Sequence, residues 1–405
     1  LGKKSISTII AISLGILLCS STVFAQTNSI SSMDIKTAES ISIKNSSDIE
    51  SQDYSIQIAE IAYEQGKDAS YKADNTLIMN QKMIDLMAKP DKTIEEEAIV
   101  ANYVPLTNEQ IYQLTKTRDV QPLEAEYNLE VAKNNRESIE NTVTLSTYTQ
   151  YINLLSNTDM IDTEEKNMNN ISDLYNISKL KLELGTISKS QYKKIIASYN
   201  NETQLLSQKQ RSLSIEEMNF NKLLGQDLNI KYSTLSADLP DNNYDINSLD
   251  YYVNSALKNN LDITNSINYT SVKQKNYDVT NKIFSAKDNI YNKQAKYDLE
   301  EAQDNLKIIK TNIQKNISDE YNLMLSKKKT LDNEINIYNS ALKNYNIASN
   351  KYKYGVLSKL DMDSNEIQYQ KECDKLNSLK RDLWIEKFKI DCQINKGLYS
   401  TTIEK

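Results

Sequence analysis

The chain reads Gly185-Thr-Ile-Ser188-Lys at one point and Gly355-Val-Leu-Ser358-Lys 170 residues further on. Beyond each copy an apolar residue recurs at every seventh position, and the same shift of 170 superimposes the two series. The two series read Tyr192, Tyr199, Leu206, Leu213 and Phe220, and Met362, Tyr369, Leu376, Leu383 and Ile390. A strict seven-residue apolar repeat makes long helices pack along a continuous seam. The sequence therefore predicts a duplicated set of long, antiparallel coiled-coil helices.

Two further pairs of similar stretches delimit the duplicated units. The opening stretch Ile43-Lys-Asn-Ser-Ser-Asp48-Ile49 resembles Leu257-Lys-Asn-Asn-Leu-Asp262-Ile263, and the closing Leu224-Gly225 resembles Lys396-Gly397. Glycine directly after a helix favours the left-handed conformation of a helix C-cap. We expect helical repeat one over residues 26–240 and helical repeat two over residues 241–405.

The expected helix lengths predict the shape of the molecule. In repeat two we expect helices over residues 248–259, 262–288, 290–354 and 359–396. The second and fourth helices together are as long as the third, so laid end to end they would cover it. The fold class is therefore all-α, with two tandem repeats that form an elongated rod.

Repeat one is longer than repeat two because of an insertion at about residues 91–121. This insertion contains the charged run Glu95-Glu-Glu97 and Pro105. Thr107 and Gln110 have the spacing of a capping box. We expect an irregular loop with one short helix here, followed by a long helix that begins at Pro122.

The N-terminus has the pattern of a secretory signal peptide. Lys3 and Lys4 precede an apolar run, and small residues lead up to Ala25. We expect residues 1–25 to be a signal peptide cleaved after Ala25, which makes the protein exported, in the cell envelope or extracellular. An uncleaved anchor, or lipidation at Cys19, are the alternatives.

Composition limits the classes of function. The net charge of -7 is spread along the chain, which argues against a nucleic-acid partner. The chain has no His, the commonest general base and metal ligand, and no Gly-rich phosphate loop. We expect no catalytic residues, no metal and no small-molecule cofactor, and hence no enzyme. Cys373 and Cys392 would lie on one helix about 28 Å apart, too far for a disulfide.

Local chemistry accounts for both Gly-x-(Ile/Leu)-Ser turns. Gly185 and Gly355 would end the long helices, and Ser188 and Ser358 would cap the next ones, with Gln191 and Asp361 at the third helical position. Ile187 and Leu357 precede these caps, where an apolar residue packs against the first helical turn. The turns are therefore either well-built helical hairpins or a surface that binds a partner.

The chain resembles the outer-membrane efflux protein (TolC) family. The resemblance rests on the duplication, the Lys-Asn-x-x-Asp-Ile motif, the Gly-x-(Ile/Leu)-Ser turns and Leu-Leu-Gly225. The resemblance implies a homotrimer that encloses a passive tunnel and works with an adaptor protein and an inner-membrane pump. It also implies that the turns, with Gly185, Ile187, Ser188, Gly355, Leu357 and Ser358, form the partner-binding tip. Asp361 lies where the family has a gate carboxylate, while the family's second acidic position is Ser364 here, with Asp363 beside it.

One departure from this family concerns the membrane. Residues 262–354 contain neither Gly nor Pro and read as helix throughout, which leaves no room for spanning strands in repeat two. We expect a TolC-like helical trunk without a β-barrel. Two functions stay open: a conduit or adaptor-docking duct of an export system, and a non-conducting extracellular scaffold that binds a cell-envelope partner. The oligomeric state discriminates between them.

Overall fold

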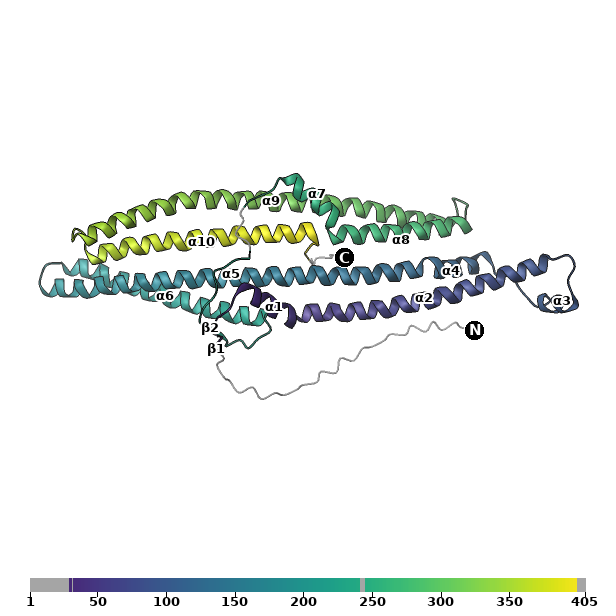
Figure 1. The fold of residues 1–405 in the computed structure, drawn as a ribbon, viewed down its shortest axis with the longest axis horizontal. Helices are drawn as coiled ribbons and strands as arrows, with labels where there is room; N and C mark the ends of the chain where they lie inside the picture. The colour runs from purple at the N-terminus through teal and green to yellow at the C-terminus, as the bar shows by residue number, and fades with distance from the viewer. Residues whose placement is uncertain (1–28, 31, 241–244, 399–405) are drawn as a thin grey trace, which may run out of the picture.

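The computed structural model describes residues 29–30, 32–240 and 245–398 and shows an elongated helical rod (Figure 1). Helices account for 84% of it, which confirms the predicted all-α fold class. The predicted signal peptide, residues 1–25, lies outside the described residues. In the described part, no helix combines the length and the hydropathy that crossing a membrane requires.

Repeat two consists of one long helix covered by two shorter ones. Its helices are α7 (Leu249–Asn259), α8 (Leu261–Ile283), α9 (Ile290–Lys353) and α10 (Lys359–Asn395). The 23-residue α8 and the 37-residue α10 pack end to end along the 64-residue α9, as the sequence predicts (Figure 1). Helix α8 ends about five residues before its predicted end, and Asn289 then caps α9 with its side chain.

The seven-residue repeat forms the seam between α9 and α10. Met324 and Leu331 of α9 pack in one cluster with Leu376, Leu383 and Ile390 of α10. Each of these side chains is at most 7% exposed. Truncating any one of them to Ala would cost about 2–5 kcal/mol of the free energy of unfolding, so this seam contributes strongly to the rod's stability.

Repeat one follows the same plan with longer flanking helices. Its helices include α1 (Ile35–Asn45), α2 (Ser47–Ala88), α5 (Gln121–Glu183) and α6 (Lys189–Leu223). Helix α5 has Pro122 in its first turn and packs with α2 along one part and with α6 along the other. At the same level, Arg136 of α5 donates from Nε to Asp53 Oδ1 of α2 at 2.6 Å, so an ion pair joins the two helices.

The insertion in repeat one is more ordered than predicted. Our expectation of a loop with one short helix is wrong, because two helices form, α3 (Ile94–Val100) and α4 (Asn108–Asp119). Thr93 and Glu96 make a capping box, and three Glu side chains in the first turn of α3 complement the helix dipole. The charged run that we interpreted as loop is therefore a helix start. The predicted capping box of Thr107 and Gln110 is confirmed at α4.

Helix α4 also joins the two repeats. It packs on α2 of its own repeat and on α8 of the other. Tyr112 of α4 is buried in a cluster with Val272 and Val279 of α8. The insertion therefore belongs to the packed rod near the end opposite the α5–α6 turn (Figure 1).

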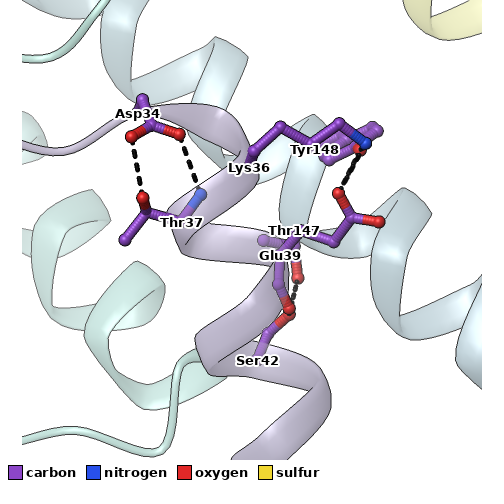
Figure 2. Close-up of polar contacts among 7 residues, drawn as sticks. All are labelled: Asp34, Lys36, Thr37, Glu39, Ser42, Thr147 and Tyr148. Carbon is purple, nitrogen blue, oxygen red and sulfur yellow. Dashed lines mark hydrogen bonds and ion pairs between the residues drawn. The ribbon is translucent and has the colours of Figure 1, made fainter. Parts of the chain in front are cut away.

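The start of the described chain is fastened to α5. Strand β1 (Ser29–Ile30) pairs in parallel with β2 (Lys231–Tyr232), and Asp34 caps α1. Figure 2 shows the contacts that follow: Tyr148 of α5 donates its hydroxyl to Glu39 at 2.5 Å, and Thr147 donates to Ser42 at 2.8 Å. Burial, followed by the hydrogen bond to Glu39, raises the pKa of Tyr148 above its usual range, so this hydroxyl remains a donor.

A polar interface holds repeat two against repeat one. Arg381 of α10 is 5% exposed and donates from Nη1 to Asp159 Oδ2 at 2.7 Å and to Ser156 Oγ at 3.0 Å, both on α5. Thr163 of α5 donates to Asp374 Oδ2 of α10 at 2.5 Å. Because these groups hydrogen-bond to one another, buried polar contacts help to hold the two repeats side by side.

Candidate functional site

The two Gly-x-(Ile/Leu)-Ser turns lie together at one end of the rod. One joins α5 to α6 and the other joins α9 to α10, and Figure 1 shows both at the left-hand end. The structure therefore brings together the two stretches that the sequence places 170 residues apart. The tip is the surface formed by residues 184–188 and 354–358.

Both turns have the same backbone geometry. Gly185 and Gly355 adopt φ values of 73° and 71°, in the left-handed region. Their N–H groups donate to the carbonyl oxygens of Leu182 and Tyr352 at 3.0 and 2.9 Å. In each turn, the N–H of the residue after the glycine donates to the carbonyl oxygen of the residue before that acceptor. These paired bonds are those of a Schellman motif, which satisfies the last carbonyls of the long helices.

The serine caps form as predicted. Ser188 Oγ accepts from the N–H of Gln191 at 3.2 Å, and the Gln191 side chain accepts from the Ser188 N–H at 2.8 Å. Ser358 Oγ accepts from the N–H of Asp361 at 3.2 Å. Each cap contributes about 1 kcal/mol to its helix, so the direction of the outgoing chain is well determined.

The two candidate gate carboxylates both have partners on their own helix. Asp361 accepts a hydrogen bond from the Ser358 hydroxyl at 2.7 Å. Asp363 pairs with Lys359 Nζ at 2.7 Å. Both carboxylates therefore support the start of α10 in a single copy of the chain.

Three apolar residues at the tip were not predicted from the sequence. Leu184, Tyr354 and Val356 expose 77%, 78% and 73% of their surface, whereas Ile187 and Leu357 are half-buried. Leu184 and Tyr354 each directly precede the turn glycine, and this repeated apolar position was the signal that could have identified them. Exposed apolar side chains gathered at one place are typical of an interaction surface.

The side chains of the tip belong to no candidate metal site in the described part of the chain. No group of three or more Cys, Asp or Glu side chains in the described residues is arranged to hold a metal ion. Cys373 and Cys392 are free thiols on α10, and Cys392 is buried. The tip offers hydrogen-bonding caps, ion pairs and apolar side chains.

Comparison with solved structures identifies the fold. The Campylobacter jejuni CmeC outer membrane channel superimposes with a TM-score of 0.54 and 13% identity, over 91% of this chain and 86% of that chain. CusC, a protein that forms a transmembrane channel, gives a TM-score of 0.62 and 11% identity over 89% and 92% of the two chains. A Pseudomonas aeruginosa membrane protein gives a TM-score of 0.61 and 8% identity over 92% of each chain.

Neither a protein-family model nor a curated protein sequence matches the chain. At identities this low the likeness establishes the fold alone. The chain has the TolC-like fold, and its helices correspond to the helical trunk of such outer membrane channels.

Proposed function

We propose that the protein is a conduit component of an export system in the cell envelope, in which three copies enclose a passive helical tunnel. The observation that carries this proposal is the match to channel proteins over about nine-tenths of both chains. Residues 1–25 would direct export, and the two repeats, residues 26–240 and 241–405, would each supply one sector of the wall.

The uncovered apolar side chains of α2 and α9 support self-association. Ile58, Ile61 and Tyr71 of α2 expose 64%, 59% and 68% of their surface, and Tyr297 and Ile308 of α9 expose 61% and 55%. Several apolar residues left in water along long helices favour association with another helix surface. In a ring, α2 of one copy would pack against α9 of the next.

The tip is the surface that we propose for partner docking. Leu184, Tyr354 and Val356 offer apolar area, and the rigid caps at Ser188 and Ser358 hold the two turns in place. An adaptor protein, with an inner-membrane pump that supplies energy, is the partner that a passive conduit requires. Asp361 and Asp363 would then line the entrance.

Mass measurement of the full chain at micromolar concentration tests this proposal, and trimers are expected. Ile58→Lys should shift the population to monomers, because the lysine would be desolvated in the seam between copies. Gln57→Lys is the matched control, since it adds the same charge at an exposed neighbour and should leave the trimer intact. If the unaltered chain gave only monomers, the conduit proposal would fail and the scaffold function would replace it.

A further inference from the structure

A cleft of about 550 Å³ lies between α2, α4 and α8, where the insertion joins the two repeats. Its volume falls within the range of about 300–1,000 Å³ that is typical of small-molecule sites. Five of the side chains that line it are aliphatic: Leu77, Ile78, Ile111, Val279 and Ile283. All three helices belong to one copy of the chain, so the cleft exists whether or not the chain assembles.

Asn80 of α2 brings a buried amide with one unused donor group to this cleft. The residue is 5% exposed, and its Oδ1 accepts from the Tyr103 hydroxyl at 2.7 Å and from the Leu106 N–H at 3.0 Å. Because a backbone N–H can only donate, the amide oxygen must be the atom that faces the insertion. The Nδ2 group donates to no acceptor among the described residues and is not sealed from solvent, so it opens on the cleft that Asn80 lines.

Two lysines and a threonine add further donors to the same cleft. Lys275 and Lys282 are seven residues apart, so they lie on one face of α8, about 10 Å apart along its axis. Within the described residues neither lysine forms an ion pair or a hydrogen bond, and the hydroxyl of Thr115 has no partner either. Gln81, the remaining neutral polar side chain of the lining, already donates to Asp85 at 2.8 Å.

The two carboxylates that line the cleft do not cancel its positive charge. Asp119 pairs with Arg118, whose Nε and Nη2 donate to Oδ1 and Oδ2 at 2.7 and 3.0 Å. Asp278 is exposed and accepts from Gln274 at 2.8 Å. The lining has three cationic and two anionic side chains, so it is positive in a chain whose net charge is -7.

We propose that this cleft binds an amphiphilic anion, with its acidic head group against Asn80, Lys275 and Lys282 and its alkyl chain against the aliphatic wall. A buried donor without an acceptor, beside two unpaired ammonium groups, favours a ligand that accepts hydrogen bonds and is negatively charged. The aliphatic side chains favour an alkyl chain over a small, fully polar anion, because each methylene group that leaves water adds to the affinity.

Calorimetric titration of residues 26–405, the chain without its predicted signal peptide, with decanoate below its micelle concentration tests the proposal. Saturable binding is expected. Decyltrimethylammonium has an alkyl chain of the same length and the opposite charge, so it should bind at least about tenfold more weakly. Acetate has the charge without the long chain, so it should bind at least about 100-fold more weakly.

A variant that combines Lys275→Met with Lys282→Met removes both charges and keeps apolar side chains of similar length. It should weaken decanoate binding by at least about fivefold. Its fold should be as stable as the original in thermal unfolding, because neither lysine has a partner to lose. The matched control combines Lys82→Met with Lys293→Met, two exposed lysines outside the cleft, and should leave decanoate binding unchanged.

Asn80→Asp keeps an oxygen for Tyr103 and Leu106 but replaces the unused donor with an acceptor. Decanoate binding should therefore weaken by at least about tenfold, whereas Asn75→Asp, at an exposed position of α2, should leave it unchanged. The proposal is overturned if the unaltered chain does not bind decanoate, if decyltrimethylammonium binds equally well, or if the double lysine variant binds decanoate normally. It is also overturned if the chain binds phosphatidylglycerol vesicles but not free decanoate.

Discussion

Glycines at the ends of the hairpin helices share a backbone conformation but not an environment. Gly185 and Gly225 have φ values of 73° and 62°, where a side chain is disfavoured. A Cβ added at Gly185 would meet nothing within 4 Å, whereas at Gly225 it would lie 2.8 Å from the Cβ of Asn45. Asn45 is held in place because its side chain donates to the Leu224 carbonyl at 2.8 Å.

Substituting these two glycines should therefore have unequal effects. Gly185→Ala should cost about 1 kcal/mol of the free energy of unfolding, the usual penalty of a left-handed residue with a Cβ. Gly225→Ala should cost about 2–4 kcal/mol, because overpacking against Asn45 adds to that penalty. Urea unfolding of both variants measures the difference. Equal losses in the free energy of unfolding would show that the region around Asn45 moves to accommodate the added Cβ.

The two cysteines of α10 should differ in reactivity. Burial raises the pKa of the Cys392 thiol to about 12, so almost none of it is thiolate at neutral pH. Cys373 is half-exposed. In the chain without the predicted signal peptide, which contains Cys19, iodoacetamide should alkylate one thiol quickly in the folded protein. The fast phase should vanish in Cys373→Ser and persist in Cys392→Ser, and the reverse result would contradict the packing of α10.

Among the elements, the α9–α10 hairpin contains two glutamates that face each other. Lys389 Nζ lies 2.5 Å from Glu320 Oε1, and Lys327 Nζ lies 2.8 Å from Glu386 Oε2. The remaining oxygens, Glu320 Oε2 and Glu386 Oε1, are buried and have no donor among the described residues. A hydrogen bond between the two carboxyl groups therefore requires a proton, which we assign to Glu320. Burial and the hydrogen bond to Glu386 raise the pKa of Glu320 above its usual range.

This pair should make the stability of the hairpin depend on pH. Because the pKa of Glu320 is higher in the folded than in the unfolded chain, its contribution is fully present below its unfolded pKa of about 4.5 and is lost as pH rises through the folded pKa. Glu320→Gln keeps a donor for Glu386 without ionising. Its free energy of unfolding should fall less between about pH 4.5 and about pH 8 than that of the original chain.

Urea unfolding at both pH values checks this expectation. Glu301→Gln, at an exposed position of the same helix, is the control and should keep the pH dependence of the original chain. An identical pH dependence in Glu320→Gln would show that Glu320 ionises normally.

At the scale of the whole molecule, the interface between the repeats depends on Arg381. Arg381→Ala would leave Asp159 without its buried cation, which should cost about 3 kcal/mol or more of the free energy of unfolding. Arg211 is the equivalent residue of repeat one, since it lies 170 positions earlier, and it is exposed. Arg211→Ala should change stability by less than about 0.5 kcal/mol. Similar losses in the two variants, measured in urea, would contradict the asymmetric interface.

Local patterns in the chain were sufficient to predict the long helices and their turns. The seven-residue repeat places Met324, Leu331 and Leu383 on one seam, and the caps at Ser188 and Ser358 involve residues only three apart. Helical periodicity and capping depend on residues only a few positions apart, so they can be recognised in the sequence without knowledge of the rest of the fold. The insertion was the exception. Its charged residues led us to predict a loop, whereas the acidic run lies in the first turn of helix α3.

Contacts between distant segments were decided only by the folded molecule. Examples are Arg381 with Asp159, and Tyr112 of α4 against α8. The sequence shows these residues as ordinary positions on amphipathic helices. Which of them meet depends on how each helix is rotated and shifted against its neighbours, and that is set jointly by packing along the whole rod.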